Sequence, residues 1–320
     1  MIKWEADPLY FIFKNEVPGV VKMHIHKLDP KDWIKLDATY YGQMKLRKQL
    51  MKENFEAVFV SRSAPSTEIA KTEVLDHLLE NLNTYHSDKF RLLRNENNET
   101  IGVENLILDE KIFLNTADPL VIASHLVQED WIVMEWDEES SEYVLSSGIL
   151  CFPMSWSLQQ KFLKPLTKIH APSREYDHIS DNVANVFDSI TPKGSVWRAN
   201  WVLSNNLKSS FDLFSPISHR HEEKKNVSSE YDFEKTGKEI FLRVEYQTLR
   251  RLPKSNAVLF SIRTYQRPLE EFLSLPKQDA KALADAIRNL SDHARIYKGA
   301  HLWGPAALHY LDTLVQNAKL

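Results

Sequence analysis

The first third of the chain carries apolar residues at helical spacing. A helix is predicted to begin at Pro30, since proline is favoured in a first turn. Its buried face would carry Trp33, Leu36 and Tyr40. A second amphipathic helix is predicted after Pro65, where apolar residues recur near a period of 3.6. Those residues are Ile69, Val74, Leu75, Leu78, Leu79 and Leu82.

Beyond residue 127 the spacing becomes that of β-strands. Two β-rich runs come first, a helical stretch follows, and three further strand-like runs complete the region. The strand-like runs are Trp131–Trp136, Tyr143–Phe152, Ser195–Leu203, Ile240–Leu249 and Ala257–Tyr265. The helical runs between them are Trp156–Ile169, which Pro165 interrupts, and Ile179–Ile190. This order predicts a five-stranded antiparallel sheet with crossover helices, which is the order of elements in a PAS domain.

These patterns divide the chain into three parts and predict an α+β fold. Residues 1–127 form an N-terminal arm and helical layer, 128–270 form the PAS-like core, and 271–320 form C-terminal helices. The last part has a helical stripe that ends at Gly299. The fold is therefore expected to be a central sheet flanked by N-terminal and C-terminal helical layers.

Composition excludes several classes of protein. The 320 residues carry a net charge of −4, which leaves no excess of basic residues for binding nucleic acid. Apolar runs are too short to cross a bilayer, so we expect no membrane segment and a cytoplasmic protein. The single cysteine, Cys151, excludes an iron–sulfur cluster within this chain. The eight glycines form neither a dinucleotide fingerprint nor a P-loop.

Two histidine pairs have a spacing that could hold zinc. His24 and His26 would share one side of an extended segment, as would His219 and His221. The sequence places no third ligand near either pair. Exposed surface histidines are the favoured interpretation of both.

The last predicted hairpin carries charged residues at strand spacing. Arg243, Glu245 and Gln247 would share one face, because alternate residues of a strand point the same way. Spacing alone favours a cross-strand ion pair of Glu245 with Arg243 or Arg263. A binding role for these side chains is the alternative.

This hairpin also resembles the signature of the haem-dependent oxidative N-demethylase alpha-subunit family. The matching residues within 243–269 are Arg243, Glu245, Gln247, Thr248, Leu249, Arg251, Leu252, Pro253, Ser255, Ala257, Ile262, Arg263, Thr264, Tyr265, Pro268 and Leu269. Further matches occur in family order, among them Gln128-Glu129-Asp130, Cys151-Phe152-Pro153, Ile169-His170-Ala171-Pro172 and Val196-Trp197-Arg198 with Asn200-Trp201. The resemblance covers about residues 23 to 270.

The resemblance implies a PAS-like domain that binds haem b and oxidises a small secondary methylamine with O2. The products would be a primary amine and formaldehyde. Because this chain has no flavin, nicotinamide or iron–sulfur site of its own, electrons would come from a separate flavin and iron–sulfur protein.

The resemblance also assigns roles to particular residues. His170 would be the axial ligand of the haem iron, with His178 in reserve, since it lies in the matching motif after the first crossover helix. Arg198, Arg243 and Arg263 would anchor the haem propionates or order the sheet face. Glu245 would bind the protonated amine as the catalytic carboxylate. The chain departs from the family pattern at Met154, Ser155, Ser173 and Tyr246.

Two alternatives belong to other classes of protein. A haem-PAS sensor or binding module would hold haem without turning over an amine. A haem-free PAS-like structural protein would instead fill the pocket with side chains, for which 15 Phe, 11 Tyr and 8 Trp offer material.

Overall fold

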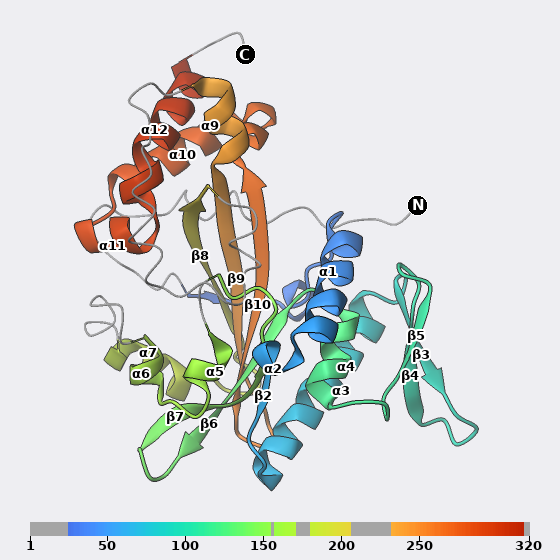
Figure 1. Ribbon diagram of the computed structural model, residues 1–320. Helices are drawn as coiled ribbons and strands as arrows, with labels where there is room; N and C mark the ends of the chain where they lie inside the picture. Colours follow the sequence, from blue (N-terminus) through green and yellow to red (C-terminus); the bar gives the residue numbers. More distant parts are fainter. Residues whose placement is uncertain (1–24, 155–156, 171–179, 206–231, 317–320) are drawn as a thin grey trace.

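The structure, a computed structural model, describes residues 25–154, 157–170, 180–205 and 232–316 (Figure 1). The side chains of His170, residues 180–184, His293 and Tyr297 lie outside the described part. Helices pack around a large antiparallel sheet, so the protein is of the mixed α+β kind expected from its sequence.

The large sheet has seven strands in the order β1-β8-β9-β10-β6-β7-β2. Five of them coincide with the predicted strand-like runs. Two short strands from the N-terminal third extend the sheet at its edges, which the sequence did not predict. The strands are β1 (His26–Lys27), β2 (Phe59–Ser61), β6 (Asp130–Asp137), β7 (Glu142–Ile149), β8 (Val196–Ser204), β9 (Phe241–Arg251) and β10 (Val258–Pro268).

The N-terminal layer contains the helix predicted after Pro65, but the prediction of a helix from Pro30 through Tyr40 was wrong. A short 3-10 helix, η2 (Pro30–Asp32), is followed by irregular chain as far as α1 (Tyr40–Glu53). The other helices of the layer are α2 (Phe55–Val58), α3 (Pro65–Tyr85) and α4 (Pro119–Leu126). Trp33, Leu36 and Tyr40 are nonetheless fully buried.

A second, three-stranded sheet lies within the N-terminal part, where only helices were expected. Its strands β3 (Phe90–Arg94), β4 (Thr100–Asn105) and β5 (Glu110–Phe113) pair in chain order. Figure 1 shows this sheet projecting beyond α3 and α4, away from the large sheet.

The two faces of the large sheet have different coverings. The crossover face carries Arg243, Glu245, Gln247 and Leu249 of β9, and the layer face carries the residues between them. One end of the crossover face packs against α5 (Leu158–Lys161), α6 (Leu166–His170) and α7 (Ser180–Ser189). Apolar side chains of these helices form a separate core there: Leu158, Leu166, Ile169 and Phe187, with Ile190 beyond α7.

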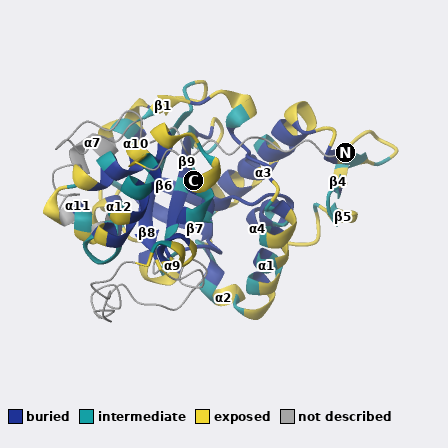
Figure 2. Ribbon diagram, turned by 90° about the horizontal axis from the view of Figure 1, so that it is seen from above, coloured by how far each residue is buried: buried dark blue, intermediate teal, exposed yellow. Residues whose placement is uncertain are grey.

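The layer face packs against the N-terminal helices and contributes to the main core. Trp131 and Val133 of β6 and Trp201 of β8 join Trp33 and Met44 in this core. Figure 2 shows the buried residues concentrated along the central strands and on the sides of the helices that meet them.

The C-terminal helices are fixed to β8 at one turn. Gly299 has a φ of 68°, and an added Cβ would lie 2.4 Å from the carbonyl oxygen of Leu203. The neighbouring carbonyl of Lys298 accepts a hydrogen bond from the Leu203 amide at 2.8 Å. The helices are α9 (Phe233–Glu239), η5 (Leu269–Ser274), α10 (Lys277–Arg288), α11 (Asp292–Tyr297) and α12 (Ala300–Gln316). Among the described helices, none is long and apolar enough to span a bilayer.

Candidate functional site

Polar side chains gather on the crossover face beyond the end that α5, α6 and α7 cover. Strand pairing sets Asn200 opposite Glu245 and Arg198 opposite Gln247, and it sets Thr264 opposite Glu245 on the other side. Directly paired residues point to the same face, so these side chains form one surface. We call it the polar patch, and it consists of Arg198, Asn200, Arg243, Glu245, Gln247, Thr264 and Gln266.

Glu245 occupies the centre of the polar patch. Its Oε1 accepts a hydrogen bond from Arg243 Nη2 at 2.9 Å, and its Oε2 accepts one from Gln247 Nε2 at 2.9 Å. The side chain keeps 22% of its surface exposed. A carboxylate has about four acceptor positions. Arg243 and Gln247 thus orient the carboxylate without using all of its accepting capacity.

Arg243 is almost completely buried and connects Glu245 to the rest of the core. Besides Glu245, its Nη2 donates to the carbonyl oxygen of Phe152 at 2.8 Å and to Thr264 Oγ1 at 3.3 Å. The ion pair of Glu245 with Arg243 that the spacing favours is therefore present, although both residues lie on β9 and the pair does not cross between strands. Arg243 positions the carboxylate.

Asn200 and Lys298 form a second group at the edge of the polar patch. Lys298 Nζ donates to Asn200 Oδ1 at 3.1 Å and to the Trp201 carbonyl oxygen at 3.1 Å. The ammonium also lies 4.6 Å from the centre of the Trp201 ring. Sequence reasoning missed Lys298, because it comes from the turn before α12; the signal for Asn200 was its period-two relation to Arg198.

Arg263 lies on the layer face, so the structure separates it from Arg198 and Arg243. It pairs with Tyr246 of β9, and its fully buried guanidinium donates to Asp37 Oδ2 at 2.6 Å and to Gln43 Oε1 at 2.6 Å. This arrangement joins the N-terminal layer to the sheet. It does not fit the expectation that Arg263 and Arg243 anchor the same ligand.

The matching motif Gln128-Glu129-Asp130 also joins the layer to the sheet. Asp130 accepts hydrogen bonds from the amides of Cys151 and Phe152 and pairs with Arg47 at 2.9 Å, with both side chains fully buried. Glu129 accepts from the Lys35 amide at 3.0 Å. Burial raises the pKa of Glu129 to about 7, and the charge of Arg263 opposes that rise.

The turn end of the β9–β10 hairpin is held by two charged side chains. Glu73 of α3 accepts hydrogen bonds from the amides of Lys254 and Ser255 and from the Ser255 hydroxyl. Arg251 donates to the carbonyl oxygens of Phe187 and Ile190, at the C-terminal end of α7. Two residues of the signature, Arg251 and Ser255, therefore fix the turn of the hairpin to its neighbours.

The predicted axial ligand falls mostly outside the described part. The backbone of His170 ends α6, but its side chain is not described, and neither is any part of His178. Just before His170, Lys161 Nζ donates to the Ile169 carbonyl oxygen at 2.8 Å, and Thr167 Oγ1 donates to Glu142 Oε1 at 3.0 Å.

Other metal-binding candidates find no support in the described residues. His26 is exposed and stacks on Trp197 with ring centres 4.7 Å apart, while His24, His219 and His221 are not described. No group of three His, Cys, Asp or Glu side chains comes together in the described ranges. Burial raises the pKa of the Cys151 thiol to about 12, which disfavours a thiolate ligand.

Two of the four departures from the family pattern can be located. Tyr246 lies on the layer face, where its hydroxyl donates to the Asp32 carbonyl oxygen at 3.1 Å, so it is remote from the polar patch. Met154 has a φ of 47°, which is left-handed. Ser155 and Ser173 lie outside the described residues.

The described residues test one side of the haem prediction. The apolar end of the crossover face is filled by the side chains of α5, α6 and α7. Arg198 is half-buried on the same face as Glu245, where a guanidinium suits a carboxylate of the cofactor. Of the three arginines, Arg198 has the face and the partial exposure that suit a propionate, Arg243 is buried beside Glu245, and Arg263 faces the other way.

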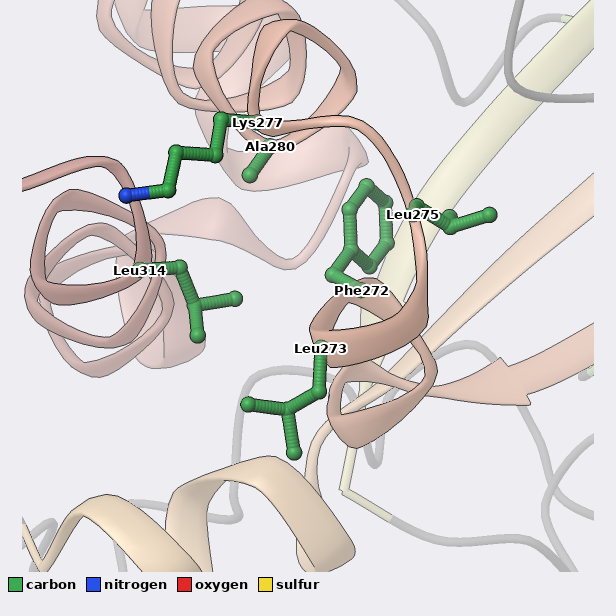
Figure 3. Close-up of a pocket in the computed structure, with 6 residues that line it drawn as sticks. All are labelled: Phe272, Leu273, Leu275, Lys277, Ala280 and Leu314. Atoms are coloured by element: carbon green, nitrogen blue, oxygen red, sulfur yellow. The ribbon is translucent and has the colours of Figure 1, made fainter. Parts of the chain in front are cut away.

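A small pocket elsewhere contains none of these residues. It lies between η5, the start of α10 and the end of α12 (Figure 3). Its lining is Phe272, Leu273, Leu275, Lys277, Ala280 and Leu314. Because it contains one charged group and no member of the polar patch, it does not alter the choice of site.

Comparison with known families gives one match of high coverage. Residues 24–308 match the family described as haem-dependent oxidative N-demethylase, alpha subunit-like. The match includes every strand of the large sheet, the whole polar patch and the turn that carries Lys298.

Proposed function

Because the chain belongs to the haem-dependent oxidative N-demethylase alpha subunit-like family, we propose that it oxidises a small methylated amine. The reaction takes R-NH-CH3, O2, two electrons and two protons to R-NH2, formaldehyde and water. The observation that carries this proposal is Glu245, an oriented and partly exposed carboxylate at the centre of the polar patch.

Glu245 is the amine-binding carboxylate in this proposal. A protonated amine needs a negative partner when it leaves water, and a carboxylate on a mostly buried face supplies one. Arg243 and Gln247 hold both oxygens in place before the ligand arrives, so the carboxylate loses little freedom on binding. Its remaining acceptor positions would take the N–H groups of the ammonium.

His170 and Arg198 are the residues that would hold the haem. His170 would ligate the iron, and Arg198 would bind a propionate. When bound, the cofactor supplies the redox chemistry with O2 that no side chain can perform. The chain's own contribution is to hold the amine at Glu245 and to orient that carboxylate through the guanidinium of Arg243 and the amide of Gln247.

The core of this enzyme is proposed to be PAS-like. The support is the order of its five long strands, β8-β9-β10-β6-β7, with helices in the crossover between β7 and β8. In this view β1 and β2 are additions contributed by the N-terminal part.

A separate electron donor completes the proposal. The reaction consumes two electrons, and a chain with one cysteine and no dinucleotide fingerprint has no cluster or nicotinamide site to collect them. A flavin and iron–sulfur protein is the proposed partner. Purified protein should therefore be inactive with NADPH alone and active once such a reductase is added.

The absorption spectrum of the purified protein is the first test. A Soret band that His170→Ala shifts or removes would support the haem proposal. Absence of a Soret band after reconstitution would favour the haem-free alternative, and haem without amine turnover in the presence of a reductase would favour a haem module.

Glu245→Gln tests the role of the carboxylate. We expect the variant to lose amine affinity while it retains wild-type haem content, because the amide keeps the shape but not the charge. Glu239→Gln, an exposed carboxylate on α9, is the matched control and should change neither property. Equal loss of haem and amine binding in Glu245→Gln would mean that Glu245 is structural.

A further inference from the structure

The polar patch presents two chemically different groups side by side. One is the Glu245 carboxylate with Gln247, and the other is the Asn200 amide with Lys298. Asn200 and Glu245 are direct cross-strand partners. Side chains in that relation start about 5 Å apart, so one small ligand can touch both.

The orientation of each amide follows from its charged partner. An ammonium has only donors, so the Asn200 atom that faces Lys298 is the oxygen, and the NH2 group occupies the other branch of the amide. A carboxylate has only acceptors, so the Gln247 atom that faces Glu245 is the nitrogen. Asn200 thus offers a donor to a ligand, while Gln247 offers its carbonyl oxygen as an acceptor.

The charges around these amides follow the same division. Arg198 lies two residues from Asn200 on the same face of β8, and the Lys298 ammonium is bonded to Asn200. Both cations lie on the β8 side of the patch. Glu245, the anion, lies in the middle strand. A ligand that carries only an ammonium would complement Glu245 on β9, but it would offer no acceptor to the Asn200 donor on β8.

We infer that the polar patch recognises an N-methylated amino acid, with its ammonium at Glu245 and its carboxylate at the amide of Asn200. The two charges of an α-amino acid are separated by one carbon, which matches the spacing of neighbouring strand positions. This inference rests on the proposed function, since it takes Glu245 as the amine-binding group. It adds the substrate class and assigns a specificity role to Asn200, which Lys298 positions.

A carboxylate at the Asn200 amide has two sources, the substrate and the haem propionate that the proposed function places at the neighbouring Arg198. The shared chemistry is a carboxylate that accepts a charge-assisted hydrogen bond from an amide N–H. Isothermal titration of the purified holoprotein with N-methylglycine and with dimethylamine separates the sources, because dimethylamine has no carboxylate. Haem content of each variant is measured in parallel.

Asn200→Asp is the decisive variant. It keeps an acceptor for Lys298 and so should fold, but it places a negative charge where the ligand carboxylate would lie. We expect wild-type protein to bind N-methylglycine about tenfold or more tightly than dimethylamine, since a charge-assisted hydrogen bond is worth that factor. Asn200→Asp should abolish the preference, because the added carboxylate repels that of N-methylglycine and attracts the ammonium of dimethylamine, so that affinity falls for the first amine and stays equal or rises for the second, with haem content unchanged.

Asn97→Asp makes the same chemical change at an exposed position in the β3–β4 turn and is the matched control. It should retain the preference. Equal or tighter binding of dimethylamine by wild-type protein, or an unchanged preference in Asn200→Asp, would overturn the inference. Loss of haem in Asn200→Asp would also overturn it, by assigning this side of the patch to the cofactor.

Failure of the proposed function has a different signature. In that case Glu245→Gln would not weaken the binding of N-methylglycine or of dimethylamine. Both the proposed function and the inferred substrate class would then be refuted. Binding of dimethylamine that depends on Glu245, without a preference for N-methylglycine, would leave the proposed function standing and refute this inference alone.

Discussion

The two faces of the β9–β10 hairpin each hold a buried arginine beside a carboxylate, and the two carboxylates differ in what else they can bind. On the layer face, Asp37 is 7% exposed and receives Arg263 together with the amide and hydroxyl of Thr39. On the crossover face, Glu245 is 22% exposed and receives one donor on each oxygen. Both arginines are buried, so what distinguishes the structural pair from the binding group is the carboxylate: how exposed it is and how many donors it already accepts from.

The same contrast runs along the hairpin from its turn to its open end. At the turn, Glu73 and Arg251 bind backbone groups of neighbouring elements. At the open end, Glu245 binds side chains and remains partly exposed. A family signature that spans the whole hairpin thus contains residues retained for folding beside residues suited to binding.

The largest effect is expected from breaking the layer-face pair. Arg263→Leu removes the arginine partner of the buried Asp37 carboxylate, which should lower the free energy of unfolding by about 3–5 kcal/mol. Chemical denaturation measures this. A loss of haem from protein that remains fully stable would instead make Arg263 a cofactor residue and break the comparison.

The pH dependence of stability tests another carboxylate of the layer face. Glu129 is fully buried, and its Oε2 has no hydrogen-bond partner among the described residues. Its pKa is raised to about 7 from 4.5, so between these values the folded protein holds a proton that the unfolded chain releases. The free energy of unfolding should therefore fall by about 3 kcal/mol as pH rises from about 4.5 to about 7, and then level off.

Glu129→Gln isolates that contribution. Glutamine keeps an acceptor for the Lys35 amide and cannot ionise, so the fall over this pH range should be absent from the variant. Denaturation curves for both proteins at pH 5, 6, 7 and 8 provide the measurement. If the free energy of unfolding changed with pH by the same amount in the wild type and the variant, Glu129 would not titrate in this range.

A smaller effect is expected at the turn of the hairpin. Glu73→Gln replaces one of two accepting oxygens with a donor group that faces the Lys254 and Ser255 amides, so we expect a loss of about 2 kcal/mol. Thermal unfolding monitors it. Glu80→Gln on the same helix, with a side chain that is 79% exposed, should unfold as wild type does. Equal melting temperatures for both variants would contradict the role of Glu73 in holding the turn of the hairpin.

The smallest effect on stability is expected at Glu245. Glu245→Gln should cost about 1 kcal/mol or less, because the side chain is partly exposed and the amide can still accept from Arg243. A small loss of stability together with a loss of amine affinity would distinguish Glu245 from Arg263. A fall in the free energy of unfolding as large as that of Arg263→Leu would contradict the distinction between a binding group and a structural pair.

The strands could be predicted from the sequence because their residues alternate or are β-rich, and Arg243, Glu245 and Gln247 do share a face. The helix predicted from Pro30 failed for a tertiary reason. Glu129 takes the Lys35 amide and Asp37 takes the Thr39 amide, so donors that a helix would use are bound elsewhere. The β3–β4–β5 sheet was missed since its strands are short and alternate weakly.

The candidate site was predictable in part for the same reason. Period two places residues of one strand relative to each other, but the face of Arg263 depends on how β10 is aligned with β9, which local pattern does not specify. The meeting of Asn200 with Lys298 joins positions 98 residues apart along the chain. No local spacing encodes such a contact.

The turn at Lys298 and Gly299 has a consequence for how relatives of this protein diversify. This turn fixes the C-terminal helices to β8 and supplies the ammonium that orients Asn200. Gly299 has little freedom to change, because an added Cβ would meet the Leu203 carbonyl oxygen, whereas Lys298 holds Asn200 through its side chain and Leu203 through its backbone carbonyl, which any residue supplies. From the inferred role of Asn200 in specificity, we expect substrate preference to change among relatives through substitutions of Lys298, without a change in the strands that carry Glu245.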